Sequence, residues 1–409
     1  MKCTALALIP LAVVIFASSA DAGEKEFPPV TELPDNKDLP DPWLFFDGTT
    51  RVKTYEDWAK RREELKALFK HYEYGDYPPL CTNATATIES EKPMFGGKAT
   101  LYEATIRMGP DMAVSGHIDW LVPKGKGPFP LILHTGYALT GKRTKYNVVA
   151  HPTADFMEKV IDRGYVAAQW YCYEYDEEGK KNLQVRKAFP KLDVRTLTAW
   201  GWSAGGIIGY LGGLPYVDAK KCALEGNSRR GKAALWAGVN DDRIAIAVPS
   251  CSGAGGNALF RYQGSGSETL KRVQSRFPHW FAPRFKGFAD NETKLPFDQH
   301  LLRALVAPRA VLHCDGNNSD DWANQEGGQE SYRAAQHVYD WLQVKNANGF
   351  YVHKEGHGWF ENDWYCLMDF ADKYYFDKDP ASGRKFNELQ YPAVKLYSWV
   401  APPIPKSSK

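Results

Sequence analysis

Two serines of this chain lie among glycines in a way that could support nucleophilic catalysis. The stretch Gly201-Trp202-Ser203-Ala204-Gly205 is a literal G-x-S-x-G sequence. That sequence works as a nucleophile elbow only where a strand ends in a tight turn and a helix follows, so that the serine oxygen stands above the sheet. Residues 194–211 instead show one continuous helical pattern. We therefore interpret Ser203 as a residue that permits close helix packing.

Ser228 lacks the strict sequence but has the right neighbours. A predicted strand over 222–225 precedes it and a predicted helix over 232–238 follows it. Gly226 and Gly231 would permit a tight turn and a close helix approach, and the backbone N–H of Arg229 would face a developing oxyanion. The sequence therefore predicts Ser228 as the nucleophile of an acyl-enzyme mechanism. The alternative is that Ser228 only caps the helix that follows it.

A histidine after the last strand would complete a hydrolase with its catalytic residues in the order Ser, acid, His. The predicted strand over 350–354 leads into Gly356-His357-Gly358. His357 thus lies in a loop just past a strand end and is the predicted general base. His353 lies within the strand, where a structural role is expected.

The segment Gly226-Asn227-Ser228-Arg229-Arg230-Gly231-Lys232 resembles the G-x-S-R-x-G-K nucleophile sequence of the glucuronoyl esterases, carbohydrate esterase family 15, bacterial type. Further similar stretches follow in the same order at 235–238, 252–256, 278–281, 297–300 and 307–309. The resemblance extends from about residue 41 to residue 376. It implies an α/β-hydrolase fold and hydrolysis of the ester that joins 4-O-methyl-glucuronic acid side chains of glucuronoxylan to lignin alcohols, with no metal or cofactor.

The resemblance also implies roles for further residues. Arg229 would assist the oxyanion through its side chain, and Lys232 would bind sugar hydroxyls. Trp322 and Glu268 would line the sugar site. The alternatives are ordinary: Arg229 and Lys232 as solvated helix residues, and the other two as packing or lid residues.

The acid of the Ser, acid, His triad is the one member for which this chain departs from the family pattern. Many members carry a glutamate directly before Ser-Gly-Ala-Gly-Gly, where this chain has Cys251. A neutral thiol cannot stabilise the imidazolium that forms when His357 takes a proton. Other members carry an Asp-x-Trp pattern after the next strand, which here selects Asp320 as the acid. Asp321 and Asp315 are the competing carboxylates, and a Ser–His dyad is the remaining possibility.

The pattern of the whole chain predicts the scaffold for these residues. Antiparallel strands are expected over 84–88, 99–108 and 113–122, followed by alternating strands and helices typical of an α/β fold with a mainly parallel sheet and helices on both faces. The later strands are predicted at 130–134, 165–170, 222–225, 244–249, 310–314 and 350–354. The helices are predicted at 55–72, 154–163, 194–211, 232–238, 330–345 and 362–375. Residues 252–297 interrupt this alternation of strands and helices and are predicted to form a lid-like insertion.

The N-terminus is typical of a cleavable secretory signal over 1–22, with a short apolar run and small residues before the cleavage site. The remaining 23–409 would form a single domain: an arm, helix and first strands over 23–114, a catalytic core over 115–376 and a tail over 377–409. No later stretch approaches the roughly 20 apolar residues of a membrane helix. We therefore expect a secreted or periplasmic protein without a membrane partner. The six cysteines beyond the signal lack metal-type spacing, and their pairing is left open.

Composition narrows the class of ligand. The net charge is +2, with Lys and Arg interspersed among Asp and Glu, which argues against nucleic-acid binding. Aromatic residues make up 13% of the chain and could stack on sugars or fill the core. The expected protein is a secreted serine esterase whose partner is glucuronoxylan or another lignin–carbohydrate ester. The alternatives are an acetyl or feruloyl esterase, and a catalytically silent carbohydrate-binding homologue.

Overall fold

A computed structural model of the chain describes residues 27–135, 154–264, 266–317 and 321–405. The predicted signal segment 1–22 and Asp320 therefore lie outside the described residues. The described strands form one sheet in the order β1-β2-β3-β5-β4-β6-β7-β8-β9. Their bounds are β1 Thr85–Met94, β2 Ala99–Met108, β3 Val114–Pro123, β4 Phe129–Thr135, β5 Val166–Trp170, β6 Val217–Asn227, β7 Ile246–Ser250, β8 Ala310–Gly316 and β9 Asn348–His353.

The sheet changes character along its length, as the sequence pattern predicts. Strands β1, β2 and β3 pair antiparallel, and β3 pairs antiparallel with β5. From β5 through β4, β6, β7 and β8 to β9 all pairs are parallel. Strands β5, β7 and β8 are buried along their whole length, which requires cover on both faces. The predicted α/β class is confirmed.

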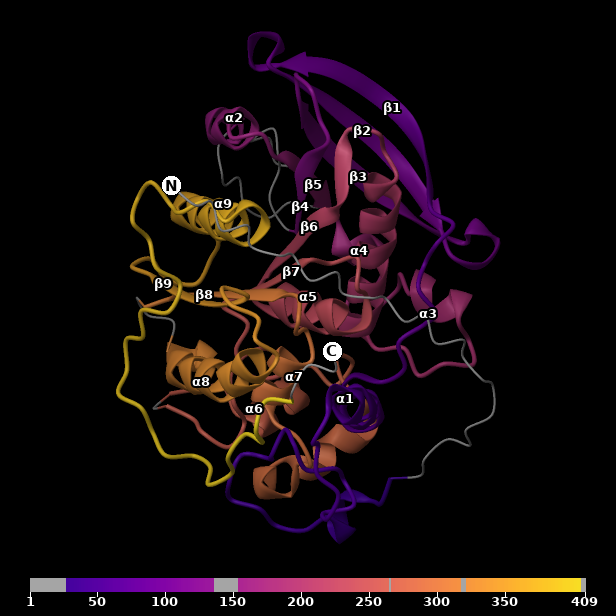
Figure 1. Cartoon of the computed structure of the whole chain (residues 1–409). Coiled ribbons are helices and arrows are strands. Elements are labelled where there is room, and N and C mark those ends of the chain that lie inside the picture. Colours follow the sequence, from indigo (N-terminus) through magenta and orange to yellow (C-terminus); the bar gives the residue numbers. More distant parts are fainter. Residues whose placement is uncertain (1–26, 136–153, 265, 318–320, 406–409) are drawn as a thin grey trace, which may run out of the picture.

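Helices supply that cover (Figure 1). The helices α2 and α9 lie on one side of the sheet, and α4, α5 and α8 lie on the other. The bounds are α1 Tyr55–Phe69, α2 Ala154–Asp162, α3 Gln184–Ala188, α4 Thr196–Gly212, α5 Arg229–Asn240, α6 Leu270–Arg276, α7 Gln299–Ala304, α8 Gln325–Trp341 and α9 Glu361–Phe376. All six predicted helices are present. The short helices α3, α6 and α7 were not predicted, because helices of this length depend on tertiary packing rather than on sequence pattern.

Ser203 lies in the middle of α4, as predicted, and not at an elbow. Its side chain is buried, and its hydroxyl donates to the Trp200 carbonyl at 2.9 Å within the same helix. A Cβ atom on Gly201 would lie 3.0 Å from the Ala233 carbonyl oxygen of α5, and one on Gly205 would clash with the Asp241 carboxylate. The two glycines therefore permit close packing of α4 on α5.

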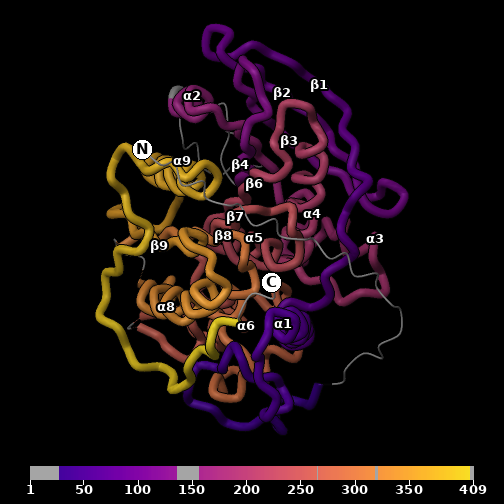
Figure 2. The backbone as a smooth tube through the Cα atoms, viewed as in Figure 1, coloured from indigo at the N-terminus to yellow at the C-terminus, as the bar shows by residue number. Residues whose placement is uncertain are grey.

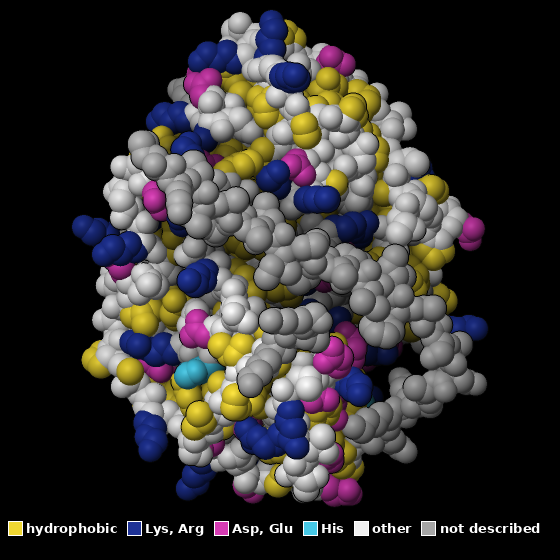
Figure 3. All heavy atoms as spheres, in the orientation of Figure 1, with side chains coloured by type: hydrophobic (Ala, Val, Ile, Leu, Met, Phe, Trp, Pro, Cys, Tyr) yellow, Lys and Arg dark blue, Asp and Glu magenta, His cyan; other side chains and the backbone are white. Residues whose placement is uncertain are grey.

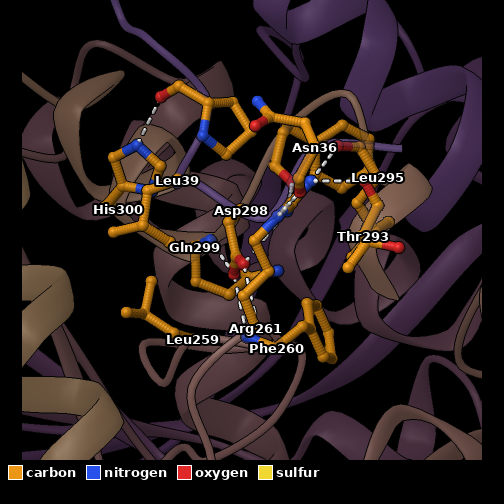
Figure 4. A network of polar contacts seen from close by, with 12 residues as sticks. Asn36, Leu39, Leu259, Phe260, Arg261, Thr293, Leu295, Asp298, Gln299 and His300 are labelled. Carbon is orange, nitrogen blue, oxygen red and sulfur yellow. Dashed lines mark hydrogen bonds and ion pairs between the residues drawn. The ribbon is translucent and has the colours of Figure 1, made fainter. Parts of the chain in front are cut away.

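The segment 252–297, between β7 and β8, is anchored by a buried ion pair. Arg261 Nη1 lies 3.2 Å from Asp298 Oδ2, and the Asp298 carboxylate also accepts from the Phe260 and Gln299 backbone N–H groups (Figure 4). Arg261 further donates to the carbonyls of Asn36 and Leu295. One guanidinium thus ties this segment to the N-terminal arm.

The C-terminal tail reinforces the same arm (Figure 2). It runs past α8 towards the N-terminal arm and α1. The Leu39 N–H donates to the Leu396 carbonyl at 2.8 Å, and Trp399 Nε1 donates to the Leu39 carbonyl at 2.9 Å. The described N-terminal arm and C-terminal tail therefore pack on the half of the molecule that carries the 252–297 segment.

Most tryptophans form core rather than surface. Nine of the 13 are fully buried, while Trp322 stays half exposed. On the face shown in Figure 3, Lys and Arg side chains are interspersed with Asp and Glu. Within the described residues no helix is long and apolar enough to cross a membrane. Cys81, Cys172, Cys222, Cys314 and Cys366 are buried thiols.

A buried carboxyl group lies in β6 three residues before Ser228. Glu225 is fully buried, and His134 Nδ1 of β4 lies 3.5 Å from its Oε2. Burial raises the pKa of Glu225 to about 8 from 4.5, although Arg230 and the Thr135 backbone oppose the shift. The folded protein thus retains a proton that the unfolded chain loses between these two values, so the free energy of unfolding should fall as pH rises through this window.

We predict that Glu225→Gln, which is neutral at all pH values, flattens this dependence. Between about pH 4.5 and pH 8, the Tm of the wild type should fall more than that of the variant. At pH 8 the variant should melt higher, by on the order of 3 °C or more, because each pKa unit corresponds to about 1.4 kcal/mol. Thermal melts across this pH range measure the difference, with the exposed Glu63→Gln as the matched control. Parallel curves for Glu225→Gln and wild type would contradict the prediction.

Candidate active site

Ser228 occupies the junction between β6 and α5 in a backbone conformation that few residues adopt. Its φ and ψ angles are 61° and −129°, and its side chain makes no capping hydrogen bond to α5. The capping alternative is therefore wrong. A positive φ at a non-glycine residue costs on the order of 1–3 kcal/mol and persists only where the surrounding structure enforces it. The geometry is that of a nucleophile elbow.

Two glycines and a neighbouring strand enforce this conformation. A Cβ atom on Gly226 would clash with the Arg230 carbonyl, and one on Gly231 would lie 2.7 Å from the Gly226 carbonyl oxygen. The Ser228 N–H donates to the Ser250 carbonyl at the end of β7, at 2.8 Å. Only glycine lets β6 and α5 approach this closely, as the sequence predicts.

A cavity of about 260 Å³ opens at Ser228. It brings together five residues that the sequence selects from three separate segments: Ser228, Arg229, Lys232, Glu268 and Trp322. The remaining lining residues are Arg272, Arg276, Phe277 and Trp280, all from the 252–297 segment. Its volume is at the small end for ligand pockets and suits a ligand group of about one sugar ring.

Lys232 and Glu268 form the buried polar floor of this cavity. Lys232 Nζ donates to the Ser252 carbonyl at 2.6 Å and the Ala254 carbonyl at 2.5 Å, and lies 3.7 Å from Glu268 Oε2. Burial lowers the pKa of Lys232, an effect that Glu268 opposes and Arg229 strengthens. The ammonium group thus donates two of its three protons to carbonyl oxygens, and the third can be donated to Glu268 or to a bound hydroxyl. Lys232 is a buried residue, not a solvated one.

Arg229 is held in place from two sides. Its Nη1 lies 2.5 Å from Glu178 Oε1, and its guanidinium lies 5.0 Å from the Phe277 ring centroid and 5.1 Å from that of Trp280. These two rings stack on each other at 3.8 Å. A half-buried ion pair and an aromatic wall therefore restrict the rotamers of Arg229. Its backbone N–H lies in the first turn of α5, where helix geometry provides no acceptor.

The loops after β8 and β9 meet beside this cavity. The rings of Trp322 and His357 lie 4.6 Å apart, and the Trp322 carbonyl accepts from the Glu268 N–H at 2.9 Å. The Cys251 thiol donates to the Gly358 carbonyl at 3.7 Å. Because the parallel strands β6, β7, β8 and β9 all end at this edge, Ser228, Cys251, Trp322 and His357 belong to one cluster of loops.

The competing carboxylates differ in their surroundings. Asp320, the predicted acid, lies outside the described residues. Asp315 is buried in β8 and lies 2.8 Å from His313 Nε2, under α8. Asp321 is exposed at the start of the short helix Asp321–Ala323. Asp315 is therefore engaged by another histidine, and the loop after β8 carries the remaining candidates.

Sequence reasoning did not identify Glu178, Arg272, Arg276, Phe277 or Trp280 as residues of this site. The stretch 278–281 carried part of the family resemblance, but it suggested no role for the aromatic wall. Glu178 precedes Arg229 by 51 residues and lies in an irregular loop after β5. No local sequence pattern marks such a partner, because tertiary structure alone brings it to Arg229.

Comparison with known proteins agrees with this geometry. Residues 111–343 match the family model described as glucuronyl esterase, fungi. A carbohydrate esterase of an unknown prokaryotic organism is 31% identical over 82% of this chain and 89% of its own length. The 4-O-methyl-glucuronoyl methylesterase 1 of Wolfiporia cocos is 28% identical over 98% of this chain and 96% of its own.

A solved structure provides the same result in three dimensions. The carbohydrate esterase family 15 glucuronoyl esterase from Caldicellulosiruptor kristjansonii superposes with a TM-score of 0.77 at 29% identity, and covers 91% of this chain and 99% of its own. The family resemblance and the predicted α/β-hydrolase fold are confirmed. The chain belongs to the glucuronoyl esterase family, carbohydrate esterase family 15, and is a carboxylic ester hydrolase of that family.

Proposed function

We propose that this protein hydrolyses 4-O-methyl-glucuronoyl esters, as in glucuronoxylan–lignin linkages, through an acyl-enzyme on Ser228. The observation that carries the proposal is the cavity itself. It places an elbow serine beside a fixed guanidinium and beside a lysine–glutamate pair suited to sugar hydroxyls. The names of the related esterases point to the same substrate class.

The reaction follows from the groups at the elbow. Ser228 Oγ attacks the ester carbonyl carbon while His357 takes its proton. The carbonyl oxygen becomes an oxyanion next to the Arg229 backbone N–H and guanidinium, whose attraction grows as the charge develops. The intermediate collapses, and the alcohol leaves with the proton from His357. Water then attacks the acyl-enzyme by the same route and releases the glucuronate.

The sugar ring would be recognised by the polar floor and the aromatic walls of the cavity. Glu268 can accept hydrogen bonds from ring hydroxyls, and the third proton of Lys232 can donate one. The half-exposed Trp322 offers an apolar face for the ring. A uronate ester presents such hydroxyls next to its scissile carbonyl, which is why this substrate is favoured over an acetyl or feruloyl ester.

We also propose that the 1–22 segment is a signal that exports the protein to its substrate.

Asp320 is proposed as the acid that orients His357. Cys251 at the end of β7 offers a thiol in place of a carboxylate, so the loop after the next strand, β8, is the proposed source of the acid. Trp322 of that loop already contacts the His357 ring. Asp320 precedes Trp322 by two residues, in the spacing that the resemblance implies.

The function is tested with purified protein on benzyl glucuronate, acetyl xylan and a feruloyl ester. We expect turnover chiefly of benzyl glucuronate, which Ser228→Ala abolishes. The matched control Ser203→Ala should retain most of the activity, because Ser203 is a packing residue of α4. Preferred turnover of acetyl xylan would reassign the substrate. Binding of xylan without any turnover would indicate a silent homologue.

Arg229 and its partner Glu178 should affect kcat more than KM. Arg229→Ala removes a group that acts on the oxyanion, and lost oxyanion donors cost on the order of 100- to 1,000-fold in kcat. Glu178→Gln keeps the side-chain shape but weakens the 2.5 Å ion pair, so we expect a smaller fall in kcat. Steady-state kinetics on benzyl glucuronate measure both. A change in KM alone would make Arg229 a ground-state binder.

The identity of the acid is tested by comparing single and double variants. Asp320→Asn should lower kcat by orders of magnitude at neutral pH, while Asp321→Asn should lower it far less. Cys251→Glu, which places a carboxylate at the end of β7, should restore part of the activity in the Asp320→Asn background. If Asp321→Asn abolishes activity instead, the acid is Asp321. If neither variant matters, the enzyme works with a Ser–His dyad.

A further inference from the structure

The cavity at Ser228 carries more positive charge than a neutral ester requires. Among the described residues, its lining contains Arg229, Lys232, Arg272 and Arg276 and one carboxylate, Glu268. Arg229 is paired with Glu178 and Lys232 lies near Glu268. Within the described part of the chain, no ion pair engages Arg272 or Arg276. These two arginines belong to α6 and play no part in the proposed hydrolysis.

The two arginines are four residues apart and therefore share one face of α6. Leu270, Val273 and Gln274 of this helix are buried and anchor it to the protein. Arg272 and Arg276 are both exposed, in contrast to Lys232 and Glu268, which are buried. The buried pair thus forms the floor of the cavity, and the arginines form its solvent-facing rim.

Two guanidinium groups lie near the Phe277 ring at this cavity. The guanidinium of Arg276 lies 5.8 Å from the Phe277 ring centroid, and that of Arg229 lies 5.0 Å from the same centroid. The positive charge of Arg229 also contributes to lowering the pKa of the buried Lys232. Such an arrangement creates a positive potential that a bound anion would relieve.

We propose that Arg272 and Arg276 form a subsite for a sugar carboxylate, namely that of a second, unesterified uronate on the same glycan. This inference rests on the proposed function, since it places the esterified sugar on the Lys232–Glu268 floor. A scissile ester is neutral and cannot use the rim charge. The rim faces solvent, where the glycan has to leave the cavity, so a neighbouring acidic substituent would meet the two guanidinium groups. Arginine suits a carboxylate because its planar fork donates two parallel hydrogen bonds.

A second sugar carboxylate has the same chemistry as the neighbouring uronate: that of the glucuronate released by hydrolysis. That carboxylate forms at Ser228, next to Arg229 and deeper than the rim. The exposure of Arg272 and Arg276 therefore favours the neighbouring uronate over the product, and the experiment separates the two.

The test compares two xylo-oligosaccharides that carry one esterified glucuronoyl group, with and without a second, free glucuronate. For wild type we expect KM to be about 3- to 10-fold lower on the doubly substituted substrate at low salt, as for two solvent-exposed ion pairs. The Arg272→Gln/Arg276→Gln variant should lose most of this preference. In 0.5 M NaCl the preference of the wild type should shrink, because salt screens exposed charges.

Lys271→Gln provides the matched control. It removes one positive charge from the same helix, but Lys271 pairs with Asp290 at 2.6 Å and does not line the cavity. Its preference should equal that of wild type. An unchanged preference in the double arginine variant would overturn the subsite, as would an equal loss in Lys271→Gln. If the double variant only weakens inhibition by free glucuronate, the arginines hold the product and the proposal is wrong.

A binding measurement keeps this inference separate from the proposed hydrolysis. In the Ser228→Ala background, calorimetric titration with the two oligosaccharides reports the preference without turnover. Tighter binding of the doubly substituted glycan that depends on the two arginines supports the subsite even if no ester is cleaved. If the Ser228→Ala variant binds both glycans equally and the wild type still hydrolyses the ester, the subsite is refuted and the proposed hydrolysis is not.

Discussion

The candidate active site depends on one backbone constraint, the positive φ of Ser228 between β6 and α5. Such a conformation is unfavourable for a side-chain-bearing residue and has to be imposed by its surroundings. Gly226 and Gly231 allow β6 and α5 to approach closely, and the Ser250 carbonyl of β7 fixes the Ser228 N–H. The conformation of Ser228 therefore requires a sheet that is complete up to β7, which couples the geometry of the proposed nucleophile to the stability of the parallel core.

Charge is the second organising feature. The cavity at Ser228 is lined by cations, and each of the inner two has its own acidic neighbour: Glu178 beside Arg229 and Glu268 near Lys232. A guanidinium that is paired and packed on aromatic rings needs little reorganisation when an oxyanion forms, and such preorganised groups provide much of the rate enhancement in acyl transfer. The electrostatics of the site thus follow from how tightly its cations are held.

The 252–297 segment provides half of the cavity, although it is not part of the sheet. It contributes Glu268 and the aromatic wall of Phe277 and Trp280. Its anchor is the Arg261–Asp298 ion pair, which also binds the N-terminal arm. The arm, the segment and the C-terminal tail therefore stabilise one another on the half of the molecule that binds the sugar in the proposed function.

The sequence alone determined the α/β class, most strands and long helices, and the preference for Ser228 over Ser203, because hydrophobic periodicity and the placement of glycines are local properties. It also selected Lys232, Glu268 and Trp322 through resemblance, and the structure places all three on one cavity. Only the tertiary structure revealed Glu178 as the partner of Arg229, the short helix α6 and its arginines at the rim. These features depend on contacts between residues far apart in the chain, which no local pattern encodes.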